Sequence, residues 1–331
     1  MRIVVLAGGV GGARFLMGVR AFARQTGAEV TAVVNVGDDA IMHGLRICPD
    51  LDSVMYTLGG GADTDRGWGR AGETWTVREE LAAYEAEPTW FSLGDRDIGT
   101  HLVRTRMLAA GYPLSAVTAA LCARWQPGVQ LLPATDDRLE THVVVPEEGG
   151  GQRAIHFQEW WVRHKAGLPA RRFVFVGAEA ATPAPGVLAA LAAADLVLVA
   201  PSNPVVSIAP ILAVPGLRAA VAGAAAPVVG VSPIINGAPV RGMADRCLAA
   251  IGVECTAAGV GRLYGGRGAA GTPVDGGDAA ADGLLDAWLV AVDDAATEVP
   301  GARVSAVPLW MTDEAATAAM VRAAVEVAGV G

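Results

Sequence analysis

Aromatic residues, paired cysteines and long apolar runs are all scarce in this sequence of 331 residues. Aromatic residues make up 5% of the chain and hydrophobic residues 52%, so much of the core must come from small side chains such as alanine. The four cysteines, Cys48, Cys122, Cys247 and Cys255, are scattered without a CxxC pair, which disfavours a structural zinc site or a disulfide framework. No apolar run reaches the roughly 18 residues that a membrane span needs, so we expect no transmembrane segment and no membrane partner.

Positive charge is also in deficit, with 25 Lys and Arg against 34 Asp and Glu and a net charge of −9. A general nucleic-acid-binding protein needs a basic face for phosphate contacts, so we expect no nucleic-acid partner. An anionic small molecule stays compatible with this charge, because clustered arginines, backbone amides and a divalent cation can hold phosphates. The chain opens on a strand-like segment, without the basic start and longer apolar stretch of a signal peptide, which predicts a cytoplasmic protein.

Apolar runs alternate with helix-forming stretches along most of the chain. The pattern predicts buried strands at residues 2–7, 30–36, 173–176, 196–200, 228–231 and 304–309, with a first helix at 13–25 and a last one at 313–327. Strands that alternate with helices are typical of a doubly wound α/β fold with a mainly parallel sheet. We therefore predict a Rossmann-like core made of residues 1–60 and 173–331.

Residues 61–172 have a different pattern. Helical stretches near residues 77–86, 99–110 and 115–125 precede short strand-like pieces at 141–145 and 153–157. We expect an inserted, mostly helical subdomain that covers the site. Phe157, Trp160 and Trp161 lie in it and could stack on a flat ring, although at least one of the two tryptophans is more simply explained as core. The Gly-rich and Ala-rich stretch 265–283 is predicted to be a loop.

A glycine-rich segment, GGVGG at residues 8–12, follows the first predicted strand. Glycines allow a sharp turn and a close backbone approach to a phosphate, and the helix behind them presents free amides. The dinucleotide fingerprint GxGxxG fails because Arg14 stands at its last position, and no Walker A lysine is present. We assign Gly9, Gly11 and Gly12 to phosphate binding; the simpler interpretation is an ordinary turn between strand and helix.

Four carboxylates follow the second predicted strand within fifteen residues. Asp38 and Asp39 end the segment that begins at Asn35, and Asp50 and Asp52 precede a predicted helix at residues 53–58. Carboxylates at the strand ends of an α/β sheet are suited to holding Mg²⁺, and one of them could accept a proton from an attacking hydroxyl. The alternative is that Asp52 only caps the helix and that Asp38 and Asp39 only form a turn.

Two further polar segments are candidate binding loops. Ser92, Gly94, Asp95 and Arg96 lead into a helix that carries Asp97, Thr100, His101 and Arg104. Spacing alone favours a capped amphipathic helix with solvated charges there. Ser202 and Asn203 stand between two prolines directly after a predicted strand, which makes a rigid loop able to read a base or a phosphate. Ser232 and Pro233 follow the next strand in a similar way.

Together these segments resemble the 2-phospho-L-lactate transferase family of coenzyme F-420 biosynthesis, and most closely its actinobacterial phosphoenolpyruvate transferase branch. The resemblance runs nearly end to end. It is carried by residues 8–14, 35–39, 47–52, 93–97 with Thr100 and His101, 156–160, and 201–204 with Ser207.

The resemblance implies a transferase that is a Rossmann-like homodimer. The implied donor is guanosine diphosphate that carries a three-carbon acid, either enolpyruvyl or lactyl. The implied acceptor is the ribityl hydroxyl of the 7,8-didemethyl-8-hydroxy-5-deazariboflavin precursor, and GMP leaves. Mg²⁺ is expected, with Asp38 and Asp52 near the metal and the hydroxyl, the glycine segment and Asn203 near the donor, and Arg96 near the deazaflavin.

Two alternatives belong to other classes of protein. A related family shares the glycine segment and the loop at residues 201–204 but resembles nucleotide-sugar-binding regulators that transfer nothing. The aromatic insertion and the segment at residues 49–52 favour the transferase. A dinucleotide-dependent oxidoreductase is disfavoured by the failed fingerprint.

Overall fold

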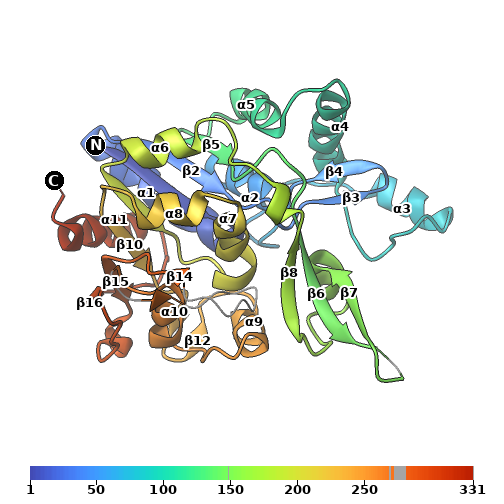
Figure 1. Cartoon of the computed structure of the whole chain (residues 1–331). Coiled ribbons are helices and arrows are strands. Elements are labelled where there is room, and N and C mark those ends of the chain that lie inside the picture. The colour runs from blue at the N-terminus through green and yellow to red at the C-terminus, as the bar shows by residue number, and fades with distance from the viewer. Residues whose placement is uncertain (148, 268–269, 272–280, 331) are drawn as a thin grey trace.

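A parallel sheet of seven strands forms the centre of the protein (Figure 1). The structure is a computed structural model that describes residues 1–147, 149–267, 270–271 and 281–330. In the order in which they lie side by side, the strands are β16 (Arg303–Ala306), β15 (Ala287–Val290), β10 (Val228–Val231), β9 (Leu196–Val199), β1 (Arg2–Ala7), β2 (Glu29–Val34) and β5 (Gln130–Pro133). Every neighbouring pair is parallel, which confirms the predicted Rossmann-like, doubly wound α/β class.

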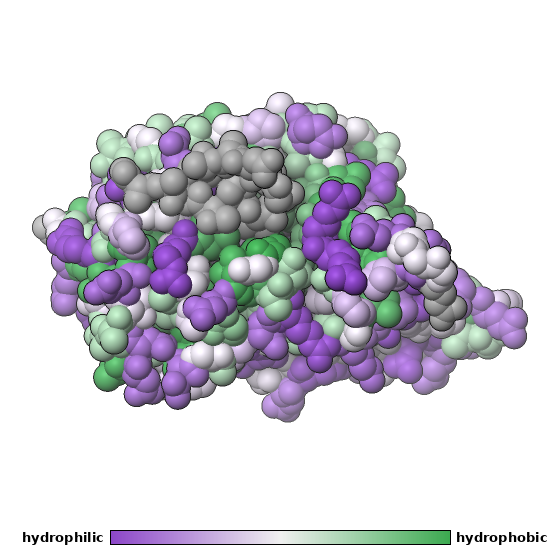
Figure 2. Space-filling view, turned by 60° about the horizontal axis from the view of Figure 1, so that its bottom comes forward, coloured by the Kyte–Doolittle hydropathy of each residue, from purple (hydrophilic) through white to green (hydrophobic). Residues whose placement is uncertain are grey.

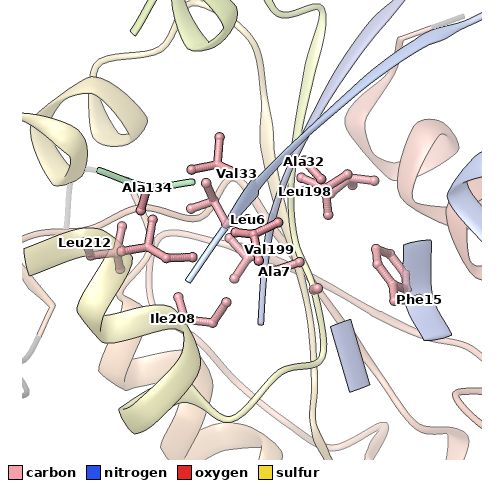
Figure 3. Close-up of a cluster of buried hydrophobic side chains, with 14 of the residues drawn as sticks. Leu6, Ala7, Phe15, Ala32, Val33, Ala134, Leu198, Val199, Ile208 and Leu212 are labelled. Carbon is pink, nitrogen blue, oxygen red and sulfur yellow. The ribbon is translucent and has the colours of Figure 1, made fainter. Parts of the chain in front are cut away.

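The apolar runs of the sequence become buried strands because helices cover both faces of the sheet. All four residues are buried in each of β9, β10 and β15, whereas the face of the molecule in Figure 2 mixes hydrophilic and hydrophobic side chains. Leu6, Val33 and Leu198 come from three adjacent strands, and Figure 3 shows them packed together in the core. Small residues such as Ala7 and Ala32 fill the space between these larger side chains, as the alanine-rich composition predicts.

The direction of strand crossing reverses between β1 and β9. From β1 the chain runs through α1 (Gly9–Thr26) to β2 on one side, and from β9 it runs to β10 on the other side. Because such crossovers are right-handed, the connecting helices lie on opposite faces of the sheet. A crevice opens outside the carboxyl ends of β1 and β9, where the glycine segment and residues 201–204 emerge, and this switch point is the usual ligand site of such sheets.

Helix α1 packs against α2 (Pro49–Leu58) and α11 (Glu314–Ala328). A Cβ atom at Gly18 would overlap the side chain of Thr317, so glycine permits the close approach of α1 and α11. Asp313 begins α11 by accepting a hydrogen bond from the amide of Ala316 at 2.8 Å. The remaining helices of the core are α6 (Val187–Ala193), α7 (Ala209–Ala213), α8 (Leu217–Ala222), α9 (Ala244–Ala250) and α10 (Ala257–Tyr264), with the π-helical turn η3 (Pro204–Ile208) and the 3₁₀ turns η2 (Ala178–Ala180) and η4 (Val292–Asp294).

Residues 61–172 contribute both to a peripheral region and to the core. The three predicted helices are present as α3 (Thr76–Ala83), α4 (Asp95–Ala109) and α5 (Leu114–Trp125). Strand β5 lies within the same range, yet it pairs with β2 and closes one edge of the central sheet. A second sheet is antiparallel and joins β7 (Gln152–His156), β6 (Glu140–Pro146) and β8 (Arg172–Val176) in that order. The π-helical turn η1 (Glu159–Arg163) follows β7 in the chain. It lies apart from the central sheet at the lower right of Figure 1.

Three differences from the sequence-based expectations stand out. The predicted strand at 173–176 is β8, which pairs with β6 and not with the core. Strands β5 and β15 were not predicted. Of the predicted loop at 265–283, residues 268–269 and 272–280 lie outside the described residues, and the short strands β13 (Ala270–Gly271) and β14 (Ala281–Asp282) pair antiparallel.

Two short hairpins complete the described structure: β3 (Ala40–Met42) with β4 (Leu45–Ile47), and β11 (Ile234–Ile235) with β12 (Ala238–Pro239). The first hairpin packs against α4. In the described part of the chain, every helix is too short or too polar to cross a membrane.

Candidate active site

A cleft of about 880 Å³ lies at the carboxyl ends of β1 and β9. The glycine segment, the acidic residues after β2 and several aromatic residues line it. Of the residues predicted from the sequence, the cleft is lined by Gly9, Gly11, Asp38, Asp50, Asp52, Ser92, Ser202 and Asn203. Gly12, Asn35, Asp39, Gly94, Asp95 and Arg96 do not line it.

The glycine segment forms the first turn of α1, and the loop after β9 holds this turn by hydrogen bonds. The hydroxyl of Ser202 donates to the carbonyl of Gly8 at 2.7 Å and accepts from its amide at 3.2 Å. A Cβ atom at Gly11 would lie 3.0 Å from the carbonyl oxygen of Pro201, and one at Gly12 would lie 2.7 Å from the Ser202 hydroxyl. Gly11 therefore allows the first turn of α1 to lie close to Pro201 at the cleft. Gly12 allows the same turn to pack closely against Ser202.

Asp38 and Asp50 form a buried acidic pair at the bottom of the cleft. The side-chain amide of Asn35 donates to Asp50 at 2.8 Å and to Asp38 at 3.3 Å, and that of Gln158 donates to Asp38 at 3.4 Å. Burial, followed by the charge of Asp50, raises the pKa of Asp38 well above its usual range. Burial also raises the pKa of Asp50 to about 7, against hydrogen bonds from Asn35 and the Gly9 amide. Neither carboxylate has an ion-pair partner among the described residues, so the pair attracts a cation or retains a proton.

Asp39 has a structural role beside this pair. Its carboxylate accepts hydrogen bonds from Arg46 at 3.0 Å and from the thiol of Cys48 at 3.0 Å, and it is fully buried. Burial raises the pKa of Asp39 to about 6 although Arg46 opposes that change. Asn35 likewise acts from behind the cleft, by holding Asp38 and Asp50 in position.

Asp52 lies in the first turn of α2 and makes a buried ion pair with Arg104 of α4. Arg104 donates to Oδ1 of Asp52, and Oδ2 has no hydrogen-bond partner among the described residues. Burial opposes the charge of Arg104, but Asp52 more than compensates and raises the pKa of the guanidinium. Asp52 therefore lines the cleft with a carboxylate that Arg104 fixes, and its second oxygen is buried 3.7 Å from Nδ1 of His101.

Asp97, His101 and Tyr56 extend this network, and sequence reasoning did not assign them to the site. The hydroxyl of Tyr56 donates to Asp97 at 2.6 Å, Nε2 of His101 lies 3.3 Å from Asp97, and Nδ1 of His101 lies 3.0 Å from Nη1 of Arg104. Because Arg104 can only donate, Nδ1 accepts and the ring proton is on Nε2, facing Asp97. Burial favours a high pKa for Asp97, but the hydrogen bonds from His101 and Tyr56 and nearby positive charge lower it overall.

The same network brings together three groups that are able to ligate a metal ion. Ligand atoms of Asp52, Asp97 and His101 lie within 4.8 Å of one another. The two predicted metal ligands are thus in different groups: Asp52 belongs to this one, and Asp38 belongs to the pair with Asp50. The signal for the additional residues was in the sequence, since Asp97, His101 and Arg104 are spaced to share one face of a helix.

Ser92 lines the cleft, but residues 94–96 are engaged with a neighbouring segment. The carboxylate of Asp95 accepts hydrogen bonds from Thr74 at 2.6 Å and from the amides that begin α3. The amide of Arg96 donates to Glu73 at 2.7 Å, and the Glu73 side chain occupies the space where a Cβ of Gly94 would stand. Gly94, Asp95 and Arg96 therefore form the N-terminus of α4 and do not line the cleft.

Asn203 both closes a turn and faces the cleft. Its side-chain oxygen accepts from the amides of Val205 at 3.0 Å and Val206 at 3.3 Å, which begins η3. Its side-chain nitrogen lies 3.5 Å from the sulfur of Cys247. Ser202 and Asn203 thus shape the rim of the cleft by binding nearby backbone groups with their side chains.

Aromatic side chains also line the cleft. Phe157 and Trp161 have ring centroids 5.6 Å apart, whereas Trp160 is buried and donates to the carbonyl of Leu168 at 2.8 Å. Trp161 lines the cleft, whereas Trp160 is buried in the core. Further aromatic lining comes from Trp68, Trp90, Phe91 and Trp310.

Comparison with known proteins gives the family. The sequence model of the family described as 2-phospho-L-lactate transferase CofD matches residues 3–325. The chain belongs to the 2-phospho-L-lactate transferase family. It is 62% identical to a phosphoenolpyruvate transferase of Nocardia farcinica, over 99% of this chain and 95% of that protein. It is 60% identical to one of Mycolicibacterium smegmatis, over 100% of this chain and 99% of that protein.

A solved structure shares the fold of this family member. A crystal structure of a UPF0052 family protein from Bacillus halodurans superposes with a TM-score of 0.60 at 17% identity, over 98% of this chain and 99% of that chain. The predicted resemblance to the actinobacterial phosphoenolpyruvate transferase branch is confirmed, and so is the predicted enzyme class. This chain is a transferase of coenzyme F-420 biosynthesis.

Proposed function

We propose that this transferase moves the enolpyruvyl-phosphate group from a GDP-linked donor to the terminal ribityl hydroxyl of the deazaflavin precursor, with Mg²⁺, and releases GMP. The observation that carries the proposal is one cleft lined by a glycine turn, buried carboxylates and aromatic side chains. The first two features suit a diphosphate and its cation, and the third suits a flat heteroaromatic ring. The similarity to named phosphoenolpyruvate transferases supports the choice of acid.

The reaction requires positioning more than covalent chemistry from the protein. The ribityl oxygen attacks the phosphorus that bears the acid, the bond from that phosphorus to the bridging oxygen breaks, and GMP leaves with the bridging oxygen. The hydroxyl proton goes to a base, for which we propose the Asp52 carboxylate: Asp52 lines the cleft, and its buried Oδ2 has no hydrogen-bond partner among the described residues. Amides at the start of α1 stabilise negative charge on the phosphates.

The buried carboxylates fit a hard divalent cation. Asp38 and Asp50 lie together in the cleft without a compensating cation among the described residues, and oxygen ligands are those that Mg²⁺ prefers. We propose Asp38 as the main ligand, with Asp50 beside it and Asp52 toward the hydroxyl. The ion would neutralise the diphosphate and the charge that develops on it.

The peripheral part of residues 61–172 is proposed to cover the acceptor. Trp68, Trp90 and Phe91 come from this range and line the cleft together with Ser92. We also propose, from the resemblance, that the enzyme is a homodimer in the cytoplasm; equilibrium sedimentation tests the dimer.

The test is a reconstituted reaction with purified enzyme, chemically guanylated phosphoenolpyruvate, the deazaflavin precursor and Mg²⁺, followed by mass spectrometry. The expected products are the phosphodiester-linked deazaflavin and GMP in equal amounts. A reaction without acceptor controls for hydrolysis of the donor. Absence of both products, with binding of nucleotide sugars instead, would overturn the proposal in favour of a regulatory protein.

A further inference from the structure

Two arginines from distant parts of the sequence lie along the same cleft. Arg14 is in α1, one turn after Val10, and Arg241 follows strand β12; both line the cleft. The guanidinium of Arg241 packs against Gly67, whose carbonyl accepts a hydrogen bond from Nη2 at 3.3 Å. Arg241 thus spans from the loop after β12 to the segment that carries Trp68.

Neither arginine has a carboxylate partner in the described part of the chain. Arg14 makes no hydrogen bond or ion pair there, and Arg241 uses one of its five donors, on the carbonyl of Gly67. Burial, and then the positive charge of Arg14, lower the pKa of Arg241, so the two cations are close enough to repel each other. In a protein with a net charge of −9, two neighbouring cations without an anion are an arrangement that an anionic ligand stabilises.

We propose that Arg14 and Arg241 bind the carboxylate of the donor's three-carbon acid. The inference rests on the proposed function and deepens it, because it assigns the group by which the enzyme distinguishes its donor from GDP and from GDP-linked sugars. A sugar in the same place has no carboxylate, so it would leave both guanidinium groups unpaired.

The carboxylate is a better match for this pair than the diphosphate. The proposed donor has three anionic groups, and the amides at the start of α1 together with a cation on Asp38 and Asp50 serve the two phosphates. The third group, a planar carboxylate, matches the planar fork of a guanidinium, which can donate two parallel hydrogen bonds to it. Lysine at either position could not donate two parallel hydrogen bonds to the carboxylate, which explains why arginine suits both positions.

The test compares the affinity for donor with the affinity for GDP. We expect Arg14→Gln and Arg241→Gln each to lower kcat/KM for guanylated phosphoenolpyruvate by about tenfold, the usual scale for one charged hydrogen-bonding group at a partly exposed site. The Kd of GDP, measured by calorimetry, should change much less in the same variants. Arg14→Lys and Arg241→Lys should recover only part of the loss.

Arg24→Gln is the matched control, because Arg24 is an exposed arginine in the last turn of the same helix. It should leave both quantities unchanged. Equal losses of GDP and donor affinity would assign the pair to the diphosphate and overturn the inference, as would unchanged kcat/KM in both Gln variants. Failure of the wild-type enzyme to use any guanylated acid would instead reject the proposed function, so the two failures are distinguishable.

Discussion

Arg104 donates to one oxygen of Asp52, and the other oxygen is buried without a hydrogen-bond partner among the described residues. The two residues are 2% and 4% exposed, so their ion pair is shielded from water. Such a pair contributes little net stability compared with apolar packing, but it fixes the direction of a carboxylate. Arg104 therefore acts through Asp52, as a positioning residue.

Replacing Arg104 by Met should lower both stability and turnover. The change leaves Asp52 buried and without its cation, which costs about 3–5 kcal/mol of unfolding free energy. Arg104→Lys keeps the charge but loses the planar guanidinium. We therefore expect a protein that is more stable than Arg104→Met, with a kcat that stays low and a KM that changes little. Asp52→Asn should lower both stability and turnover, as Arg104→Met does, because it leaves a buried Arg104 without its ion-pair partner.

Denaturant unfolding and steady-state kinetics measure these effects, and Arg106→Met, at an exposed position of the same helix, is the control. Normal kcat in a folded Arg104→Lys enzyme would show that the orientation of Asp52 does not limit the reaction.

Gly11→Val should weaken donor binding more than acceptor binding. Even the first carbon of a side chain would lie 3.0 Å from the carbonyl of Pro201, and a branched one would fill the approach to the amides of the turn. We expect the Kd of GDP to rise at least about tenfold, equal to about 1.4 kcal/mol, and the Kd of the deazaflavin precursor to stay near its wild-type value.

Gly99→Ala is the matched glycine control for this experiment. Gly99 is exposed in α4 with open space around its Cβ position, so the change should keep GDP affinity and add about 0.5–1 kcal/mol of stability. Unchanged GDP affinity in Gly11→Val would place the phosphates elsewhere in the cleft.

The central sheet could be predicted from the sequence wherever a strand is a continuous apolar run after a clear turn signal. β1, β9 and β10 meet this condition because a parallel sheet covered on both faces excludes polar residues from its strands. β5 was missed because it is short and ends at a proline, and β15 because it follows a Gly- and Ala-rich stretch. β8 was assigned to the wrong sheet, since an apolar run does not reveal its partner strand.

The candidate site was predicted best where chemistry follows a strand directly. Asp38 does so, Asp50 and Asp52 begin the next helix, and all three line the cleft. His101 and Arg104 were interpreted as solvated charges on a helix, but both are buried against α2. A charged residue looks the same in sequence whether it faces water or a buried partner, so only the packing of α4 against the carboxylate at the start of α2 reveals the network.

Asp38→Asn should separate the cost of burying a carboxylate from its use in metal binding. In a chelator the variant should unfold at a higher temperature than wild type, because one of two adjacent buried carboxylates no longer has to be ionised or protonated. Added Mg²⁺ should raise the melting temperature of wild type, since a ligand that binds only the folded state stabilises it. The variant should lose most of that response and most of its activity.

Differential scanning calorimetry with and without Mg²⁺ measures both effects. Glu29→Gln, an exposed carboxylate at the start of β2, controls for a general effect of charge. An undiminished response to Mg²⁺ in Asp38→Asn would move the metal to the group formed by Asp52, Asp97 and His101.

The last prediction concerns the acid on the donor: the enzyme should prefer the enolpyruvyl donor over the lactyl donor. The reason is the 58–62% identity to named phosphoenolpyruvate transferases across the whole chain. The two donors differ only in hybridisation and in a methylene against a methyl group, and both keep the carboxylate that we assign to Arg14 and Arg241. A pocket contact separates such a pair by only about 1–3 kcal/mol, so the ratio of kcat/KM values should lie between about 10 and 200.

A competition assay with both guanylated donors at equal concentration measures the preference, because the dehydro product is two hydrogens lighter than the lactyl product. The arginine variants provide an internal control: since both donors carry the carboxylate, Arg14→Gln should lower the two rates in parallel and leave the product ratio unchanged. A product dominated by the lactyl compound would overturn the predicted donor and leave the transferase reaction standing. A ratio that shifts in Arg14→Gln would mean that the arginine contacts the three-carbon chain itself, because only that part of the donor differs between the two substrates.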